Sequence, residues 1–410
     1  MLRHPPTVKT RVRAGETLRP MTEGEFTDAE SSASARPIPG ELVSDLRSTP
    51  LADRHAALGA SFTDFGGWSM PVRYTSDLAE HHAVRTAAGL FDISHMAEFR
   101  VEGPGAGAYL DAALAGRLSA LAVGKAKYSL LLAPSGGIID DLIVYRLTPD
   151  AFLVVANAGN REPVAGALAE RSAASADVTV ADVSDDYALL ALQGPAAAAV
   201  LRGVAGLVDV EPAIDDLRYY AWAAARFDGD DVLILRTGYT GEDGFELLAP
   251  ASVAVPLWDA VLAAGGDHGL VPAGLAARDT LRLEAGMPLY GHELSVDTLP
   301  VQAGLGRVVV EDKEAFVGKG AVAPADAPVL VGLTAEGRRA GRAGYAVVDA
   351  VGTPVGEITS GALSPTLGHP IAMAYVAPAV SAVGTALFLD VRGTRIPATV
   401  TALPFYRRTT

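Results

Sequence analysis

Several short stretches of the chain are mainly apolar and are separated by turn residues such as APSGG, and this pattern predicts β-strands. The stretches with this pattern are residues 97–101, 127–132, 138–145, 152–156, 187–192 and 231–236. Helices are predicted at residues 80–88, 162–171, 254–264 and 274–286. Another helix is expected to begin after Pro195, because proline suits a first helical turn. Gly89 is expected to end the first helix in a left-handed C-cap.

Beyond about residue 323 the pattern changes to strands separated by turns. Two long examples are GYAVVDAVGTPVGEITSG and TALFLDVRGTRIPATVTAL. Runs of strands without intervening helices are typical of an antiparallel β domain. The sequence therefore predicts such a domain over residues 323–410.

Residues 1–48 differ in composition from the rest of the chain. They carry mixed charge with Ser, Ala and Pro and lack apolar periodicity, as in SSASARPIPG. A disordered extension is expected here, because such a segment has little apolar surface to bury. The early arginines would also suit a targeting segment, although acidic residues such as Glu16 and Glu23 disfavour it. The folded body is predicted to span residues 49–322.

Composition narrows the possible functions. The chain has 410 residues, of which 50% are hydrophobic and 20% charged, so it can form two or three compact units. A formal net charge of −15 argues against nucleic-acid binding, which depends on Lys and Arg. The absence of cysteine excludes disulfides and thiolate nucleophiles, and no apolar run is long enough for a membrane helix. We expect a cytoplasmic protein without nucleic-acid or membrane partners.

A strongly apolar predicted strand begins with two adjacent aspartates, Asp140 and Asp141. Side chains alternate between the faces of a strand, so the two cannot both point the same way, and one must face the interior or a pocket. Burial raises the pKa of a carboxyl towards values that suit proton transfer. The pair is a candidate acid–base group, although such a pair can also consist of ordinary turn residues.

The segment TGYTGEDGFE, residues 237–246, places three glycines close to an aromatic residue and several acids. Glycines allow a ligand to approach the backbone, Tyr239 offers an aromatic face and Glu246 a carboxylate. The segment lacks the lysine of a phosphate loop, and its acids would repel phosphate. A planar heterocycle that carries hydrogen-bond donors fits better, while a solvated glycine-rich β-turn is the alternative.

The predicted helix in GLAARDTLRLEAGMPLYG places Arg278 and Arg282 four residues apart on one face. An arginine there could hold an acidic ligand group or pair with a carboxylate such as Glu246. A structural salt-bridge helix is the alternative. His81, His82 and His95 lie near one another in sequence but lack the spacing of a metal site, so no metal is expected. Serine-hydrolase and dinucleotide-binding motifs are also absent from the sequence.

The order of these blocks resembles the aminomethyltransferases, the T-protein family of the glycine cleavage system. The blocks are GWSMPVRY, EHHAVRTAAGLFDISHM, YSLLL, GGIIDDLIVY, ALQGP, TGYTGEDGFE, GLAARDTLRLEAGMPLYGHE and ITSGALSPTLGHPIAMAYV, and the resemblance runs from about Leu51 to Phe405. It implies an α+β fold, a three-lobed cloverleaf. Two interwoven mixed α/β lobes would bind folate, and a jelly-roll-like antiparallel β domain would form the C-terminal lobe.

The resemblance also implies a reaction and its site. The one-carbon unit would pass from the S-aminomethyldihydrolipoyl group of the H-protein to tetrahydrofolate, with release of ammonia and formation of 5,10-methylenetetrahydrofolate. Asp140 corresponds to the catalytic aspartate, and Glu246 and Arg278 would hold the pterin. Other positions that match the family's pocket are Tyr128, Tyr239, Tyr290, Met96 and Asn157.

The sequence departs from the family at one block. The pattern P-x-E-A-G-L-x-W reads PVQAGLGR here, so Gln302 replaces an acid and Arg307 an aromatic residue. A tetrahydrofolate-dependent demethylase acting on a small methylated amine or sulfonium compound therefore stays open as an alternative. Sarcosine-type oxidases and folate-binding iron–sulfur assembly proteins fit less well, because the chain lacks a flavin-binding domain and a cysteine.

Overall fold

The computed structural model describes residues 46–173, 175–321 and 323–409. The extension predicted for residues 1–48 thus lies almost entirely outside the described residues. In the part of the chain that is described, no helix has the length and apolarity to cross a membrane.

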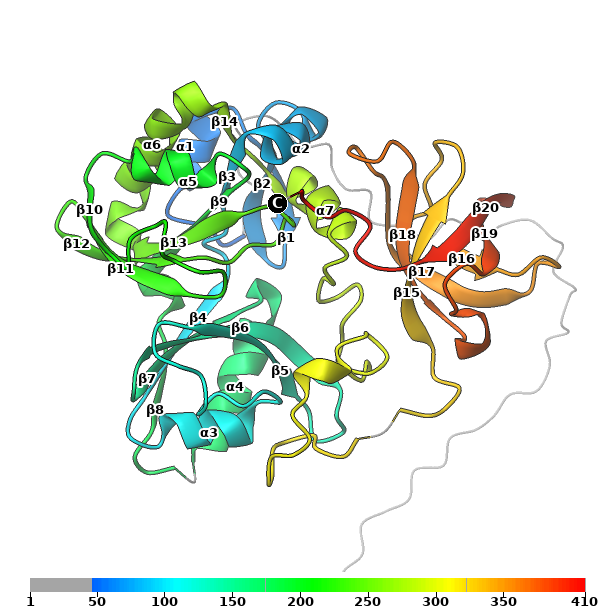
Figure 1. Cartoon of the computed structure of the whole chain (residues 1–410), viewed down its shortest axis with the longest axis horizontal. Coiled ribbons are helices and arrows are strands. Elements are labelled where there is room, and N and C mark those ends of the chain that lie inside the picture. The colour runs from blue at the N-terminus through cyan, green and yellow to red at the C-terminus, as the bar shows by residue number, and fades with distance from the viewer. Residues whose placement is uncertain (1–45, 174, 322, 410) are drawn as a thin grey trace, which may run out of the picture. The chain divides into compact units, whose positions relative to one another are not determined.

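Residues 97–182 form an antiparallel five-stranded sheet, shown with its strand labels in Figure 1. Its strand order is β5 (Ala126–Leu132), β6 (Ile138–Thr148), β7 (Ala151–Ala156), β4 (Ala97–Glu102) and β8 (Thr179–Asp182). Helices α3 (Ala106–Ala113) and α4 (Arg161–Ser172) pack on one face, where Leu142 and Val144 of β6 join their apolar side chains. The sheet therefore has one face covered by its own helices.

A seven-stranded sheet is built from residues on both sides of that segment. Its order is β10 (Leu207–Glu211), β11 (Trp222–Phe227), β12 (Asp230–Leu235), β13 (Gly244–Pro250), β9 (Tyr187–Gln193), β3 (Ala88–Asp92) and β14 (Leu270–Pro272). Only the pair β3–β14 is parallel. Because β3 precedes the five-stranded sheet and β9 follows it, the two sheets are interwoven in the chain.

Helices cover both faces of the seven-stranded sheet. Helices α5 (Ala197–Arg202) and α6 (Ala254–Gly265) share one apolar cluster with it, and α7 (Leu275–Glu284) contributes to another. The remaining elements before the barrel are α1 (Ala52–Ala57), α2 (Asp77–Thr86) and the hairpin of β1 (Ser61–Phe65) and β2 (Trp68–Arg73). Short 3₁₀ helices lie at Ala158–Asn160, Ser184–Asp186, Ala251–Val253, Gly266–His268, Gly306–Val308 and Pro378–Val380.

One hydrophobic cluster joins the two sheets. It contains Tyr145 and Val155 from the five-stranded sheet, Leu189 and Leu248 from the seven-stranded sheet, and Leu281 from α7. Because protein interiors are close-packed, a shift of one of these elements would strain its neighbours. The outer face of β6 and the neighbouring ends of β13 and α7 are therefore held relative to one another.

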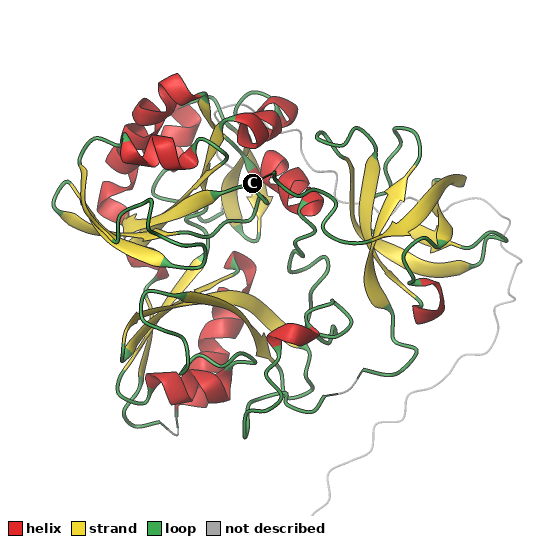
Figure 2. Cartoon of the chain, viewed as in Figure 1, coloured by secondary structure: helices red, strands yellow, loops and turns green. Residues whose placement is uncertain are grey.

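The C-terminal part forms a closed antiparallel barrel, which appears in Figure 2 as a group of strands with one short helical segment. Its strands are β15 (Val329–Ala335), β16 (Ala346–Val348), β17 (Pro354–Leu363), β18 (Pro370–Val376), β19 (Ala386–Val391) and β20 (Thr394–Thr401). Alternate residues of β19 are buried, as a barrel wall requires. The predicted antiparallel β domain is confirmed, and its closure leaves no unpaired strand edge.

One predicted helix end is wrong. Helix α2 ends at Thr86, and Gly89 lies inside β3 without a left-handed conformation. Residues 88–92 are all buried and pair with β9. A Cβ at Gly89 would lie 2.5 Å from Val84 Cγ2, so the glycine allows the strand to pass close to α2.

Candidate functional site

The two adjacent aspartates lie near the start of β6, next to an irregularity in its pairing. Strand β5 pairs Leu131 with Asp140 and Leu132 with Ile138, which leaves Ile139 as an extra residue. A β-bulge of this kind changes the direction of nearby side chains and is frequent beside active sites. The sequence prediction that the two aspartates leave opposite faces of the strand agrees with their surroundings.

Asp140 points to the face of β6 that carries Leu142, under α3 and α4. Its side chain is fully buried. The carboxylate accepts hydrogen bonds from the backbone N–H of Asn157 at 2.9 Å, from Asn157 Nδ2 at 2.8 Å and from Asn160 Nδ2 at 2.6 Å. Three fixed donors leave this carboxylate little freedom to turn.

Asp141 lies on the opposite face, together with Ile143 and Tyr145, which belong to the cluster between the sheets. It accepts a hydrogen bond from the Tyr128 hydroxyl at 3.0 Å and another from Asn157 Nδ2 at 2.9 Å. Asp141 is partly exposed, unlike its neighbour. The Asn157 amide thus bridges the two carboxylates, although they leave different faces of the strand.

Both aspartates have raised pKa values. Burial, followed by the negative charge of Asp141, raises the pKa of Asp140 to about 7, although the amides of Asn160 and Asn157 act to lower it. Burial also raises the pKa of Asp141 against the hydrogen bonds from Tyr128 and Asn157. Two carboxyls so close together cannot easily both ionise, so the pair holds one proton near neutral pH.

The glycine-rich turn, residues 237–243, connects β12 to β13. Gln193 supports one side of it: Nε2 donates to the carbonyl of Thr237 at 3.2 Å, and Oε1 accepts from the Thr240 hydroxyl at 3.0 Å. A Cβ at Gly238 would lie 2.0 Å from Gln193 Oε1. A larger residue in place of Gly238 would therefore push the Gln193 amide out of these two hydrogen bonds.

Glu246 follows the turn on β13 and is almost completely buried. Its Oε2 accepts a hydrogen bond from the Thr237 hydroxyl at 2.6 Å. Burial raises the pKa of Glu246, while that hydrogen bond and the charge of Arg278 act in the opposite direction. A buried carboxylate has several acceptor sites, so Glu246 is suited to binding a ligand's N–H groups.

Arg278 lies on α7 beside Tyr239. Its guanidinium carbon is 5.0 Å from the ring centroid of Tyr239 and 5.9 Å from that of Phe91. Within the described residues, its Nη1 is buried without any hydrogen-bond partner. Of the two roles that the sequence left open, pairing with a carboxylate such as Glu246 is therefore not the one that Nη1 fills. A buried donor without an acceptor is unfavourable, which indicates a position where a ligand acceptor would bind.

His95 has a second buried atom of this kind, since its Nδ1 lacks a hydrogen-bond partner among the described residues. The side chain is 4% exposed. Burial lowers the pKa of His95 to about 4; Arg278 lowers it too, while Asp92 opposes this. His95 is therefore neutral at pH 7, next in sequence to the predicted pocket residue Met96.

Two hydroxyls link strand β6, which carries the aspartate pair, with Glu246. Tyr145 lies on the same face of β6 as Asp141, and its hydroxyl is 2.8 Å from the Thr237 hydroxyl. Thr237 in turn donates to Glu246. The aspartate pair also interacts electrostatically with the glycine-rich turn. Burial is the main cause of the raised pKa of Tyr239, and the charge of Asp141 raises it further.

Of the other predicted pocket residues, Tyr290 lies beside the aspartate pair and Tyr239 near Arg278. The Tyr290 hydroxyl donates to the carbonyl of Ile138 at 3.1 Å, beside the aspartate pair. The Tyr239 hydroxyl donates to the carbonyl of Pro288 at 2.5 Å, which holds its ring near Arg278. Met96 is partly buried against the cluster between the sheets.

The chain is similar to known proteins over almost its whole length. Two family models match it: the GCVT N-terminal domain over residues 51–313 and the glycine cleavage T-protein C-terminal barrel domain over residues 329–407. The chain is 58% identical over 375 residues to an aminomethyltransferase of Cutibacterium acnes, a match that covers 89% of this chain and 100% of that relative. The chain belongs to the aminomethyltransferase family, the glycine cleavage T-proteins.

Other T-proteins extend the comparison. An aminomethyltransferase of Saccharopolyspora erythraea is 54% identical over 371 residues, covering 89% of this chain and all (100%) of that relative. The crystal structure of glycine cleavage system aminomethyltransferase T from Bartonella henselae matches with a TM-score of 0.80 at 40% identity, over 88% of this chain and 98% of that chain. The α+β T-protein fold predicted from the sequence is therefore confirmed.

Sequence reasoning did not single out three polar residues of this T-protein. Asn160 follows Asn157 by one turn, and this spacing after a buried strand could have indicated a second amide donor. His95 was considered only as a metal ligand. Arg85 carried no signal, because nothing in the sequence distinguishes a buried arginine from a solvated one.

The second arginine of α7 has a structural role, as the alternative interpretation held. Arg282 is 1% exposed and pairs with Glu293 at 3.0 Å and Asp279 at 2.7 Å. Gln302 also serves the fold: its amide accepts from the Leu299 N–H at 3.0 Å and donates to the carbonyl of Pro328 at 3.1 Å. A glutamate could not make the second bond.

Proposed function

We propose that this T-protein is the aminomethyltransferase of a glycine cleavage system. It takes the one-carbon unit from S-aminomethyldihydrolipoyl H-protein, passes it to tetrahydrofolate and releases ammonia, which gives 5,10-methylenetetrahydrofolate. The observation that carries the proposal is the buried, unpaired Nη1 of Arg278 beside Tyr239, on the side of the site where Glu246 lies. The aminomethyltransferases that are 54% and 58% identical support it.

The residues at this end of the site fit a pterin. Glu246 would accept hydrogen bonds from the amino and ring N–H groups, and Arg278 would donate to an acceptor on the same ring. Tyr239 offers an aromatic face beside them. Binding there would remove the cost of the buried donor on Arg278. The positions of Met96, Tyr128, Tyr290 and Asn157 suit the rest of the pocket.

Tetrahydrofolate, when bound, supplies the nitrogen that takes up the one-carbon unit. Asp141 is the carboxyl that faces it, because Asp141 is partly exposed and shares its face of β6 with Tyr145. Asp140, which the sequence prediction favoured, is buried behind it and held by three donors. Asp140 tunes the proton affinity of the pair.

The carboxyl pair can then act in both directions of proton transfer. Its single proton is available to the amine that departs as ammonia. Formation of the methylene bridge would release one proton from each of two folate nitrogens. One would return to the carboxyl pair, which restores its starting state, and the other would go to the dihydrolipoyl sulfur, which leaves as a thiol. The Tyr128 hydroxyl and the Asn157 amide keep Asp141 in place throughout.

The chain has no cysteine, so the sulfur that carries the aminomethyl group must belong to a partner. The lipoylated H-protein fills this role. We place the enzyme in the cytoplasm, with neither nucleic acid nor a membrane as a partner. The barrel and the two lobes, residues 323–410 and 49–322, would be its domains.

The test is a direct assay. Purified protein is incubated with tetrahydrofolate and H-protein loaded with the aminomethyl group, and ammonia is measured. Release of ammonia that requires both substrates is the expected result. Absence of release, together with methyl transfer from a small amine or sulfonium donor, would instead identify a demethylase.

A further inference from the structure

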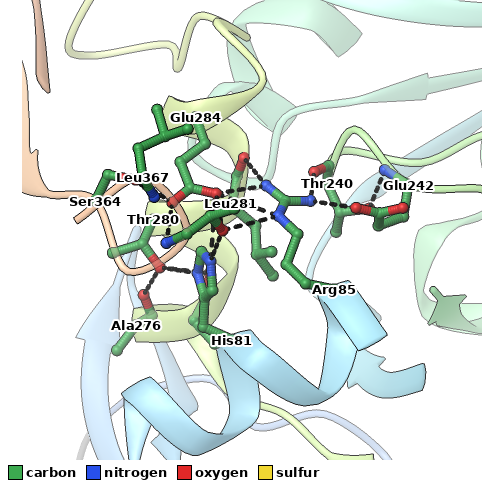
Figure 3. A network of polar contacts seen from close by, with 12 residues as sticks. His81, Arg85, Thr240, Glu242, Ala276, Thr280, Leu281, Glu284, Ser364 and Leu367 are labelled. Carbon is green, nitrogen blue, oxygen red and sulfur yellow. Dashed lines mark hydrogen bonds and ion pairs between the residues drawn. The ribbon is translucent and has the colours of Figure 1, made fainter. Parts of the chain in front are cut away.

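Arg85 of α2 connects the glycine-rich turn to α7, as Figure 3 shows. Its Nη1 donates to the carbonyl of Thr240 at 2.7 Å and to Glu242 Oε1 at 2.9 Å, both in the turn. Its Nη2 donates to Glu284 Oε2 at 2.8 Å and to the carbonyl of Leu281 at 3.3 Å, both in α7. One guanidinium thus holds two elements that are far apart in sequence.

This contact is buried on every side. The side chains of Arg85, Glu242 and Glu284 are 4%, 5% and 0% exposed. The guanidinium carbon lies 4.0 Å from the ring centroid of Tyr406, so an aromatic ring covers it. Among the described residues, removing the cation would leave buried Glu242 without an ion-pair partner and Glu284 with His81 alone, so the geometry is strongly determined.

The two elements that Arg85 joins carry the residues assigned above to the pterin. The turn bears Tyr239 and leads directly to Glu246, and α7 bears Arg278. The turn also packs closely on the end of α7, since a Cβ at Gly241 would lie 2.9 Å from the Cβ of Ala285. A shift of the turn against α7 would therefore change the distance between Glu246 and Arg278.

We propose that Arg85 is a positioning residue for the folate site, which sets the spacing of the turn and α7 without contacting the ligand. This inference rests on the proposed function, because it takes Glu246 and Arg278 as pterin contacts. The planar fork of arginine is what the position requires. A lysine would carry the charge, but its single ammonium could not reach both elements with the same geometry.

The test compares Arg85→Lys with a matched control, Arg54→Lys. Arg54 of α1 pairs with Asp259 at 2.7 Å, and their side chains are 38% and 40% exposed, away from the turn. Each protein is assayed for its Kd for tetrahydrofolate, for kcat, and for KM of the loaded H-protein. Hydrogen exchange of residues 237–243 is measured without ligand.

For Arg85→Lys, the Kd for tetrahydrofolate is expected to rise about 10-fold or more while kcat changes less than about 3-fold, since a loss of ground-state positioning appears mainly in binding. KM for the H-protein should stay as in the wild type. Exchange in the turn should become faster. Arg54→Lys should match the wild type in all four measurements.

Two results would overturn the inference. One is a folded Arg85→Lys enzyme with the wild-type Kd, and the other is a loss of stability with no change in turn exchange or folate affinity. If Arg85→Lys does not fold, Glu242→Gln decides, because it keeps the shape and an acceptor oxygen and should weaken folate binding in the same direction. A wild-type protein that binds no tetrahydrofolate would refute the proposed function itself, and this inference with it.

Discussion

Asp140 and Asp141 are adjacent in sequence, but their surroundings differ in burial and in hydrogen bonding. Asp140 is enclosed under α3 and α4, whereas Asp141 faces the tyrosine side of the site and is partly exposed. The sequence was sufficient to predict the pair, the strand and the opposite directions of the side chains. It could not say which direction is the pocket, because that depends on what packs on each face of β6.

Replacement of Asp141 by Asn is expected to lower kcat by about 10²- to 10⁴-fold, the usual contribution of a positioned acid or base. The fold should survive, because the Tyr128 hydroxyl can still donate to the amide oxygen. Circular dichroism and the unfolding midpoint serve as controls. A larger loss of kcat in Asp140→Asn than in Asp141→Asn would assign the chemistry to Asp140.

The pH dependence of kcat/KM should report the shared proton of the pair. We expect an inflection near pH 7, where the pKa of Asp140 lies as a result of burial and the charge of Asp141. Asp140→Asn removes one of two like charges, so the pKa of the remaining carboxyl falls and the inflection moves to lower pH. An unchanged profile would show that the two carboxyls titrate independently.

The glycine-rich turn is held in place by side chains from two other elements, β9 and α2. Gln193 holds it from β9, and Arg85 holds it from α2. From the sequence, the glycines are interpreted as a place where a ligand approaches the backbone. At Gly238 and Gly241, however, the space is taken by Gln193 and Ala285, so these glycines serve packing within the protein.

Two glycine substitutions separate backbone strain from packing. Gly241 has φ +82° and lies against Ala285, whereas Gly229, in the β11–β12 turn, has φ +95° and no atom within 4 Å of the place that a Cβ would take. Gly229→Ala should lose only about 1–2 kcal/mol of stability for the left-handed conformation. Gly241→Ala should lose more and should also weaken folate binding. Denaturant unfolding and tetrahydrofolate titration of both variants test this, and equal losses would contradict it.

The lobes and the barrel are joined through Glu284, at the end of α7. The Ser364 hydroxyl, from the barrel, donates to its Oε1 at 2.5 Å, and the Thr366 hydroxyl donates to its Oε2 at 2.7 Å. Arg85 and His81 of α2 contact the same carboxylate at 2.8 Å and 3.3 Å, and Figure 3 shows Arg85, His81 and Ser364 around Glu284. Burial would raise the pKa of Glu284, but these hydrogen bonds and charges hold it at about 2.

This low pKa predicts acid sensitivity of the molecule. The folded state keeps Glu284 ionised down to about pH 2, whereas the unfolded chain takes up its proton near 4.5. The stabilisation is therefore complete above about pH 5 and is lost as the pH falls towards 2; it amounts to about 3 kcal/mol. Glu284→Gln should be less stable at pH 7 and should lose less on acidification. Parallel acid-unfolding curves for both proteins would contradict this.

Short apolar stretches between turns and the order of the motifs were enough to predict the strands, the C-terminal β domain and the T-protein fold, and to name most of the residues proposed for the site. Such patterns depend on residues that are close in sequence, or on a series of blocks that is distinctive as a whole. Packing between distant segments assigned Gly89 to a strand, left Arg278 unpaired and brought Arg85 between two carboxylates. These features depend on burial and distance, which arise only when α2, α7 and the two sheets come together.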